Sequence, residues 1–138
     1  MKIYSKINKN VLLHIINRVE DINKVRNNII PENEFLQLSS MKLKNKSTFK
    51  AHYHVEKDGE EKVIAQESWV IISGLVKFIA YDLDKTIIGE YILKPGDCSI
   101  TLRGGHNYEA LEDNTLVYEY KTGPYKGMLL DKKLIDEQ

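Results

Sequence analysis

Three of the four histidines and one glutamate are residue types that commonly bind metal ions. His52 and His54 stand two residues apart in a stretch that is typical of a β-strand, so their side chains project from the same face. Two imidazoles on one face of a strand can offer two nitrogen ligands to one metal ion, because histidine is the commonest metal ligand. The pair could also be two plain polar residues on a solvated edge, and the spacing alone leaves both interpretations open.

A single carboxylate begins a later apolar stretch. Trp69 and Ile71 are in phase with Glu67, so the face that carries this carboxylate is expected to be at least partly buried. A buried carboxylate is costly unless it is paired, hydrogen-bonded or bound to a cation. Glu67 therefore favours a metal site more strongly than the histidine pair does alone.

The third histidine follows a pair of glycines. Gly104 and Gly105 let the backbone pass close to another group and turn His106 inward. The turn Pro95-Gly96-Asp97 precedes this segment. His106 can then join the residues of the earlier strands.

Four residues near the end of the chain are further candidates. Alternation along a strand puts Tyr118 and Tyr120 on one face and Glu119 and Lys121 on the other, and one of these sets should face a cavity. Tyrosine can act as a general acid and glutamate as a general base, so Glu119, Tyr118 and Tyr120 are candidate catalytic residues. Lys121 is a candidate substrate-binding residue. The alternative is a tyrosine pair packed in the core beside an exposed Glu–Lys pair.

Two residues beside the glycine turn are candidates for binding substrate. Arg103 could clamp a phosphate or carboxylate through two hydrogen bonds, or it could be a solvated loop residue. Asn107 could orient a ligand or cap a turn.

These residues must be positioned by a chain that consists mainly of short apolar stretches. Gly, Pro, Asn and Asp separate the stretches, which predicts an all-β sandwich or barrel. No helical patterns of 10 to 15 residues alternate with the strands, which argues against a parallel α/β sheet. The expected strands lie within Phe35–Leu43, Thr48–Val55, Ser68–Ser73, Leu75–Leu83, Thr86–Leu93, Cys98–Leu102, Asn107–Leu111 and Leu116–Tyr120.

Two segments flank the predicted barrel of residues 35–125. Residues 1–34 are interpreted as an N-terminal arm with a strand at Val11–Ile16, although the spacing of its apolar residues would also suit an amphipathic helix. Pro31 could begin a single helical turn later in the arm. Residues 126–138 are interpreted as a C-terminal tail, charged from Asp131 onward and expected to be loosely held.

Composition limits the classes of function. The chain has 138 residues, which is typical of one domain, and its 20 basic residues balance 20 acidic ones. This balance gives no electrostatic reason to expect nucleic acid or a membrane as a partner. The longest apolar run, Trp69 to Ile72, is far shorter than the roughly 20 residues that span a bilayer. The single cysteine, Cys98, cannot form an intramolecular disulfide and is expected to be a small buried residue. We expect a cytoplasmic protein.

The motifs together resemble those of the cupin superfamily. His52-Tyr53-His54, Glu67 with Gly74, and Pro95-Gly96 with His106 follow the order of its two motifs, over roughly Lys50 to Gly123. The resemblance implies a single cupin-type jelly-roll β-barrel. It also implies one divalent metal ion held by His52, His54, Glu67 and His106, and such a ligand set suits Fe, Mn, Ni, Co or Zn.

The spacing of the first motif departs from the family pattern. Twelve residues separate His54 from Glu67, where cupins usually have three or four. Glu67 keeps the six-residue gap to Gly74 that the motif requires. The acidic residues of the insert are rivals for the role of carboxylate ligand: Glu56, Asp58, Glu60 and Glu61.

A closer resemblance is to small single-domain cupins of bacterial surface-polysaccharide and modified-sugar biosynthesis clusters. The segments that carry it are Phe35–Gln37, Gln66–Val70, Gly104–Asn107 and Tyr118–Tyr125. It implies a metalloenzyme that acts on a small polar or sugar-derived substrate, as an isomerase or epimerase or as a dioxygenase. A non-enzymic module that binds or senses a small ligand is the alternative, and a metal-free structural barrel is a third possibility. The expected partners are a small molecule and a second copy of the chain in a homodimer.

Overall fold

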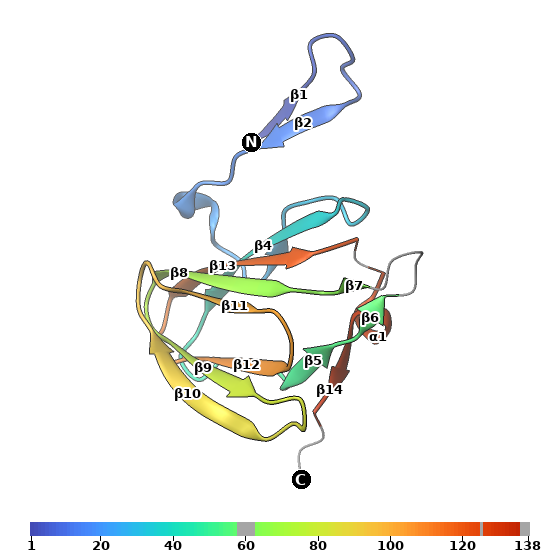
Figure 1. Cartoon of the computed structure of the whole chain (residues 1–138). Helices are drawn as coiled ribbons and strands as arrows, with labels where there is room; N and C mark the ends of the chain where they lie inside the picture. The colour runs from blue at the N-terminus through green and yellow to red at the C-terminus, as the bar shows by residue number, and fades with distance from the viewer. Residues whose placement is uncertain (58–62, 125, 136–138) are drawn as a thin grey trace.

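Two five-stranded antiparallel sheets lie face to face and form a barrel in the computed structural model, which describes residues 1–57, 63–124 and 126–135 (Figure 1). The first sheet has the order β10 (Ile87–Leu93), β9 (Val76–Tyr81), β12 (Gly105–Ala110), β5 (His52–His54) and β14 (Lys132–Leu134). The second has the order β11 (Cys98–Thr101), β8 (Glu67–Ser73), β13 (Thr115–Thr122), β4 (Leu36–Leu43) and β3 (Asn27–Asn28). The all-β jelly-roll predicted from the sequence is confirmed.

Short elements lie outside these sheets. A hairpin of β1 (Lys2–Tyr4) and β2 (Leu12–Ile15) projects away from the barrel (Figure 1), and the 3-10 helix η1 (Val19–Asp21) follows it. A second small hairpin pairs β6 (Glu56–Lys57) with β7 (Val63–Ile64). One helical turn, α1 (Met128–Asp131), leads into β14. No helix in the described ranges has the length and apolar character needed to cross a membrane.

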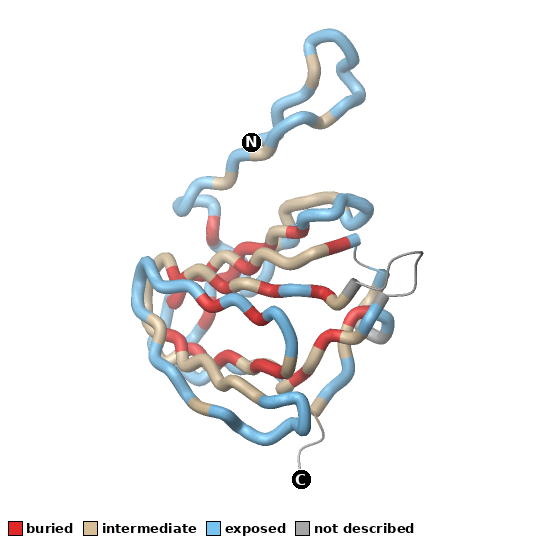
Figure 2. The backbone as a smooth tube through the Cα atoms, in the orientation of Figure 1, coloured by how far each residue is buried: buried red, intermediate tan, exposed pale blue. Residues whose placement is uncertain are grey.

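Alternation along the strands builds the core between the two sheets. In β8, Glu67, Trp69 and Ile71 are buried while the residues between them are partly exposed. Figure 2 shows buried positions along the strands of both sheets, whereas the projecting hairpin and β10 are largely exposed. Trp69 stacks on Tyr108 of the facing sheet with ring centroids 4.0 Å apart. Aromatic side chains bury large apolar areas, so this pair contributes strongly to the core between the sheets.

The glycine that closes the first motif has a steric role. Gly74 adopts φ +82 between β8 and β9, a conformation that residues with a side chain rarely adopt. A Cβ at this position would also lie 2.3 Å from Thr115 Oγ1. Gly74 therefore permits the tight turn after β8, and the length of β8 up to this turn sets the position of Glu67.

Parts of the arm are built into the barrel. Strand β3 pairs with β4 in the second sheet. Strand β2 lies within the stretch Val11–Ile16 that was expected to be a strand, but it belongs to the projecting hairpin. The segment after Pro31 forms a hydrogen-bonded turn, not a helix.

Two expectations about the rest of the chain are wrong. Lys132–Leu134 form β14 and pair with β5, and Asp131 is 1% exposed, so this part of the tail is not loosely held. Cys98 is exposed rather than buried, because it begins an edge strand with its side chain on the outer face.

Candidate metal centre

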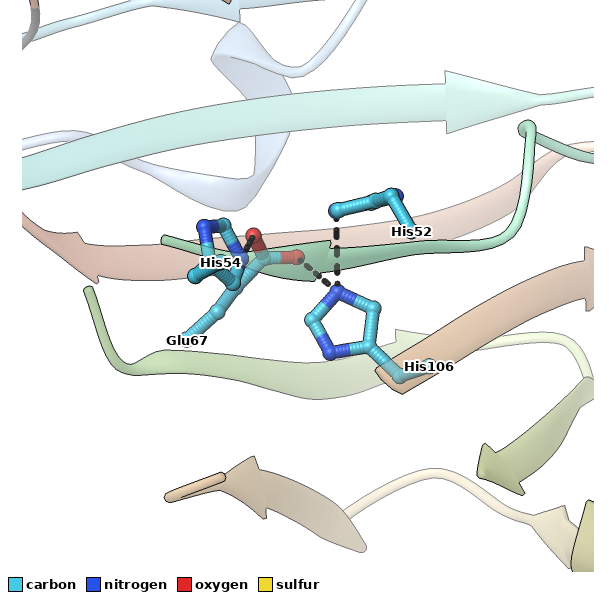
Figure 3. Close-up of side chains that lie close together, drawn as sticks. All are labelled: His52, His54, Glu67 and His106. Carbon is cyan, nitrogen blue, oxygen red and sulfur yellow. Dashed lines mark hydrogen bonds and ion pairs between the residues drawn. The ribbon is translucent and has the colours of Figure 1, made fainter. Parts of the chain in front are cut away.

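Four side chains from both sheets converge inside the barrel (Figure 3). His52 and His54 lie on β5, and His106 lies on the adjacent strand β12, directly opposite His52 in the register. Glu67 reaches them from β8 in the facing sheet. One ligand atom from each residue lies within 4.8 Å of all the others. The structure thus brings together the four residues that the sequence selected.

The distances within this cluster are short. His52 Nε2 lies 3.2 Å from His106 Nε2, and His106 Nε2 lies 3.4 Å from Glu67 Oε1. His54 Nε2 lies 3.2 Å from Glu67 Oε2, an ion-pair distance when the His54 ring is protonated. None of the four residues is more than 7% exposed.

The outer nitrogen of each histidine has its own partner. His52 Nδ1 lies 2.9 Å from the carbonyl oxygen of Lys50, and His54 Nδ1 lies 3.3 Å from the carbonyl oxygen of Asp131. Carbonyl oxygens only accept hydrogen bonds, so both Nδ1 atoms carry a hydrogen and both neutral rings present the Nε2 lone pair to the centre. His106 Nδ1 contacts Thr101 Oγ1 at 2.8 Å.

This arrangement fits a bound cation. Inward nitrogen lone pairs and a carboxylate at these distances repel one another unless a positive charge lies among them. Outer hydrogen bonds that fix the ring orientation are characteristic of metal-binding histidines. A set of three histidines and one carboxylate suits transition-metal ions. His52, His54, Glu67 and His106 therefore could hold a metal ion.

In the absence of a metal ion, a proton supplies part of this positive charge. Burial, together with His106 and Lys132, lowers the pKa of His52 to about 3. Burial also disfavours the charged form of His54, but Asp131 and Glu67 outweigh it and raise its pKa to about 9. Burial opposes ionisation of Glu67, yet contacts with His106 and His54 hold its pKa well below the usual range.

The pKa of His54 predicts how metal affinity depends on pH. In the metal-free protein the protonated ring contributes full stability below its ordinary pKa of 6.5, and this contribution is lost as the pH rises through about 9. A metal ion must displace this proton, so its affinity should increase about tenfold per pH unit between pH 6.5 and 8.5. Competition with a chelating indicator at three pH values measures this slope. An affinity independent of pH over that range would contradict the raised pKa of His54 in the metal-free protein.

A cavity of about 220 Å³ opens beside the cluster and is lined by His52 and Glu67. Its other charged walls include an ion pair: both Glu119 oxygens accept hydrogen bonds from the Arg26 guanidinium, at 2.9 and 2.7 Å. Lys121 and Lys132 also line it. Glu32 adds a further carboxylate, and the remaining walls are polar or aromatic and comprise Asn28, Gln37, Ser39, Phe49, Trp69, Asn107 and Tyr108.

The candidates on β13 are divided by the barrel wall. Glu119 and Lys121 face the cavity, as one of the two alternating sets was expected to do. Tyr118 and Tyr120 lie on the other face, where the Tyr118 hydroxyl bonds with Asn17 of the arm. Neither tyrosine lines the cavity, so the catalytic role expected for them does not fit this placement.

Asn107 and Arg103, the two candidates beside the glycine turn, line different cavities. Asn107 lines the cavity of the cluster, where its amide donates to Thr48 Oγ1 and its oxygen accepts from the Tyr108 backbone. Arg103 is exposed and lines a different cavity of about 250 Å³, so it is not positioned to bind a ligand beside Glu67 and His52.

The rival carboxylates of the insert are placed only in part. Glu56 begins β6 and is exposed, and it does not belong to the cluster. Asp58, Glu60 and Glu61 lie outside the described residues. Within the described ranges, Glu67 is the carboxylate that the three histidines share.

Three residues near the site were not selected from the sequence. Arg26 belongs to the arm, and Asp131 and Lys132 belong to the segment interpreted as a tail. Asp131 Oδ2 lies 3.3 Å from His54 Nδ1, and Lys132 Nζ lies 3.4 Å from His52 Nε2. Burial, with Lys121 nearby, lowers the pKa of Lys132. No local pattern marks these residues, because the pairing of β14 with β5, more than 70 positions away, brings Asp131 and Lys132 to the site, and the pairing of β3 with β4 brings Arg26.

Comparison with solved structures supports the fold. KdgF from Halomonas sp. is 17% identical, with 76% of this chain and 82% of that chain covered and a TM-score of 0.54. An uncharacterized protein with a double-stranded β-helix domain from Klebsiella pneumoniae is 14% identical, with 91% and 100% covered and a TM-score of 0.63. No protein-family model and no curated protein matches the chain.

A third similar structure is that of the capsular polysaccharide assembling protein CapF from Staphylococcus aureus. It is 18% identical with a TM-score of 0.64, and 81% of this chain is covered. The chain spans about 30% of the length of CapF. CapF also has a structure with the inhibitor 3-isopropenyl-tropolone. Together these neighbours show that the chain has the cupin-type fold.

Proposed function

We propose that this protein is a metal-binding cupin in which His52, His54, Glu67 and His106 hold one divalent Fe, Mn, Ni, Co or Zn ion. The observation that carries the proposal is the buried convergence of three imidazoles and one carboxylate, one ligand atom from each within 4.8 Å of the others, beside a polar cavity. Transition metals prefer such nitrogen and oxygen ligands, and a catalytic site keeps a coordination position open for substrate or water.

We further propose that the protein is a metalloenzyme for a small polar or sugar-derived substrate in bacterial polysaccharide or modified-sugar metabolism. The size and polar lining of the cavity support a small hydrophilic ligand. The fold of the capsular polysaccharide assembling protein CapF supports the metabolic setting. A bound metal ion would supply Lewis acidity for isomerisation or epimerisation, or activate dioxygen. Lys121 and Asn107 would contact the substrate, because both line the cavity.

One observation favours the alternative of a binding module without catalysis. Both oxygens of Glu119 already accept hydrogen bonds from Arg26, and Trp69 Nε1 lies 3.2 Å from Oε2. A carboxylate engaged in this way is a poor general base, so Glu119 suits the orientation of a ligand better than proton transfer. Ligand binding without turnover by the metal-loaded protein would favour the module. The homodimer expected from the sequence stays a prediction.

Elemental analysis tests the proposed site. We expect the purified protein to contain about one transition-metal ion per chain, and His52→Ala to contain less than about a tenth of that, because a lost ligand costs more than the 10- to 100-fold typical of an outer partner. His14→Ala is the matched control, since His14 is exposed and lies on β2, in the hairpin that projects away from the barrel. Full metal content in His52→Ala, or no metal uptake by the wild type, would refute the proposal.

A further inference from the structure

A lysine ammonium lies directly beside the position of the proposed metal ion. Lys132 is opposite His54 in the pairing of β14 with β5, so both side chains point to the inside of the barrel. Lys132 Nζ lies 3.4 Å from His52 Nε2. Among the residues that the structure describes, no carboxylate forms an ion pair with this ammonium.

This contact cannot persist when a metal ion is bound. His52 Nδ1 faces the carbonyl oxygen of Lys50, so the lone pair that Lys132 can contact is the one that would ligate the metal. Coordination would take this lone pair and leave the ammonium close to a second positive charge. An oxyanion in the open coordination position would accept the hydrogen bond of Lys132 and separate the two cations.

The other charges of the cavity support the same conclusion. Glu119 is neutralised by Arg26, and Glu67 is committed to the cluster. Glu32 lines the cavity but is exposed. Lys121 adds a second ammonium to the wall, with Asp131 Oδ2 at 3.7 Å. Apart from Glu67 and the Arg26–Glu119 pair, the charged side chains that line the cavity are therefore the two ammonium groups of Lys121 and Lys132 and the exposed carboxylate of Glu32.

We propose that Lys132 binds an oxyanion, the carboxylate or phosphate group of a small substrate, which also occupies the open coordination position at the metal ion. This inference rests on the proposed metal site and names the chemical class of its ligand. Lys132 is then the residue that selects an anionic over a neutral ligand.

The test uses the full-length protein loaded with Co²⁺, whose visible spectrum reports a change of ligand at the metal. Glycolate and inorganic phosphate are the anionic probes, and glycolamide is the neutral probe that matches glycolate in shape. We expect wild-type protein to bind at least one anionic probe more tightly than glycolamide. Lys132→Met should weaken that binding about 10- to 100-fold, since charge-assisted hydrogen bonds are the strong ones. Lys132→Arg should restore part of it.

Lys133→Met is the matched control. Lys133 is the next residue of β14 and is exposed on the opposite face, so its removal changes the net charge equally and should leave probe binding unchanged. Tighter binding of glycolate than phosphate indicates a carboxylate substrate, and the reverse indicates a phosphorylated one.

Two results overturn the inference. One is wild-type protein that takes up cobalt but binds glycolamide as tightly as both anions, a comparison that needs no variant to fold. The other is Lys132→Met with full cobalt content and wild-type affinity for the anions. Wild-type protein that takes up no cobalt would instead refute the metal site itself, so the two failures are distinguishable by the cobalt content.

Discussion

Glu67→Ala is expected to remove the metal ion from the protein. The carboxylate lies between two histidines, with Oε2 3.2 Å from His54 Nε2 and Oε1 3.4 Å from His106 Nε2. Its loss deletes one ligand and the negative charge that offsets a dication in a buried site. We therefore expect metal affinity to fall more than about 100-fold, beyond the loss typical of an outer partner. Competition with a chelator of known affinity measures the change, with circular dichroism as the check on folding.

The matched control for this change is Glu56→Ala. Glu56 is a carboxylate of the insert between His54 and Glu67, but it is exposed on β6 and lies outside the cluster. It should keep wild-type metal affinity. If the protein with Glu67→Ala binds metal normally and the protein with Glu56→Ala does not, the carboxylate ligand comes from the insert, and the assignment of Glu67 is wrong.

Arg26→Met is expected to lower the stability of the protein, which is the second large effect. Glu119 is 4% exposed, and Arg26 binds both of its oxygens. Removing the arginine leaves a buried carboxylate without its cation, which typically costs 3–5 kcal/mol in a fully buried pair. Because the Arg26 side chain is 38% exposed, solvent screens part of this loss. We expect the free energy of unfolding to fall by about 2–3 kcal/mol, measured by urea denaturation.

Two further variants separate the charge effect from simple loss of contact. Arg26→Met combined with Glu119→Gln should recover part of the loss, since the amide oxygen can still accept from Trp69 Nε1 without burying a charge. Lys77→Met breaks the pair of Lys77 with Glu109, whose atoms are as close at 2.7 Å but whose carboxylate side chain is 29% exposed, against 5% for that of Glu119, and should lower the free energy of unfolding far less. Equal losses for Arg26→Met and Lys77→Met would show that burial of Glu119 has no energetic consequence.

The strands were predictable because their signals are local. A strand needs only alternation of apolar and polar residues between turn residues, and each expected strand of the barrel is present. The same rule predicted that His52 and His54 share a face. Applied to β13, alternation predicted that Glu119 and Lys121 lie on the opposite face from the two tyrosines, but it did not say which face meets the cavity. The packing of the sheets decided that Glu119 and Lys121 do.

The outer residues of the site could not be predicted because no local pattern marks them. Arg26 reaches Glu119 from the arm, since β3 joins the sheet beside β4. Asp131 and Lys132 come from a charged segment, and charge near a chain end ordinarily indicates a solvated tail. Pairing of β14 with β5 places both beside the histidines. Long-range strand pairing depends on the packing of the whole barrel, so the spacing of neighbouring residues does not predict it.

The four residues of the candidate metal centre show what the local sequence determines and what only the tertiary structure decides. Alternation, the turn glycines and the cost of burying a carboxylate made His52, His54, Glu67 and His106 candidates, and the resemblance of the motifs to those of cupins joined them as one ligand set. The tertiary structure decided that Glu67 of one sheet meets the three histidines of the other, and which partners orient their rings. Local chemistry determines which side chains can bind a metal, but the stacking of two sheets determines which of them meet, because ligands far apart in sequence become neighbours only through packing of the core.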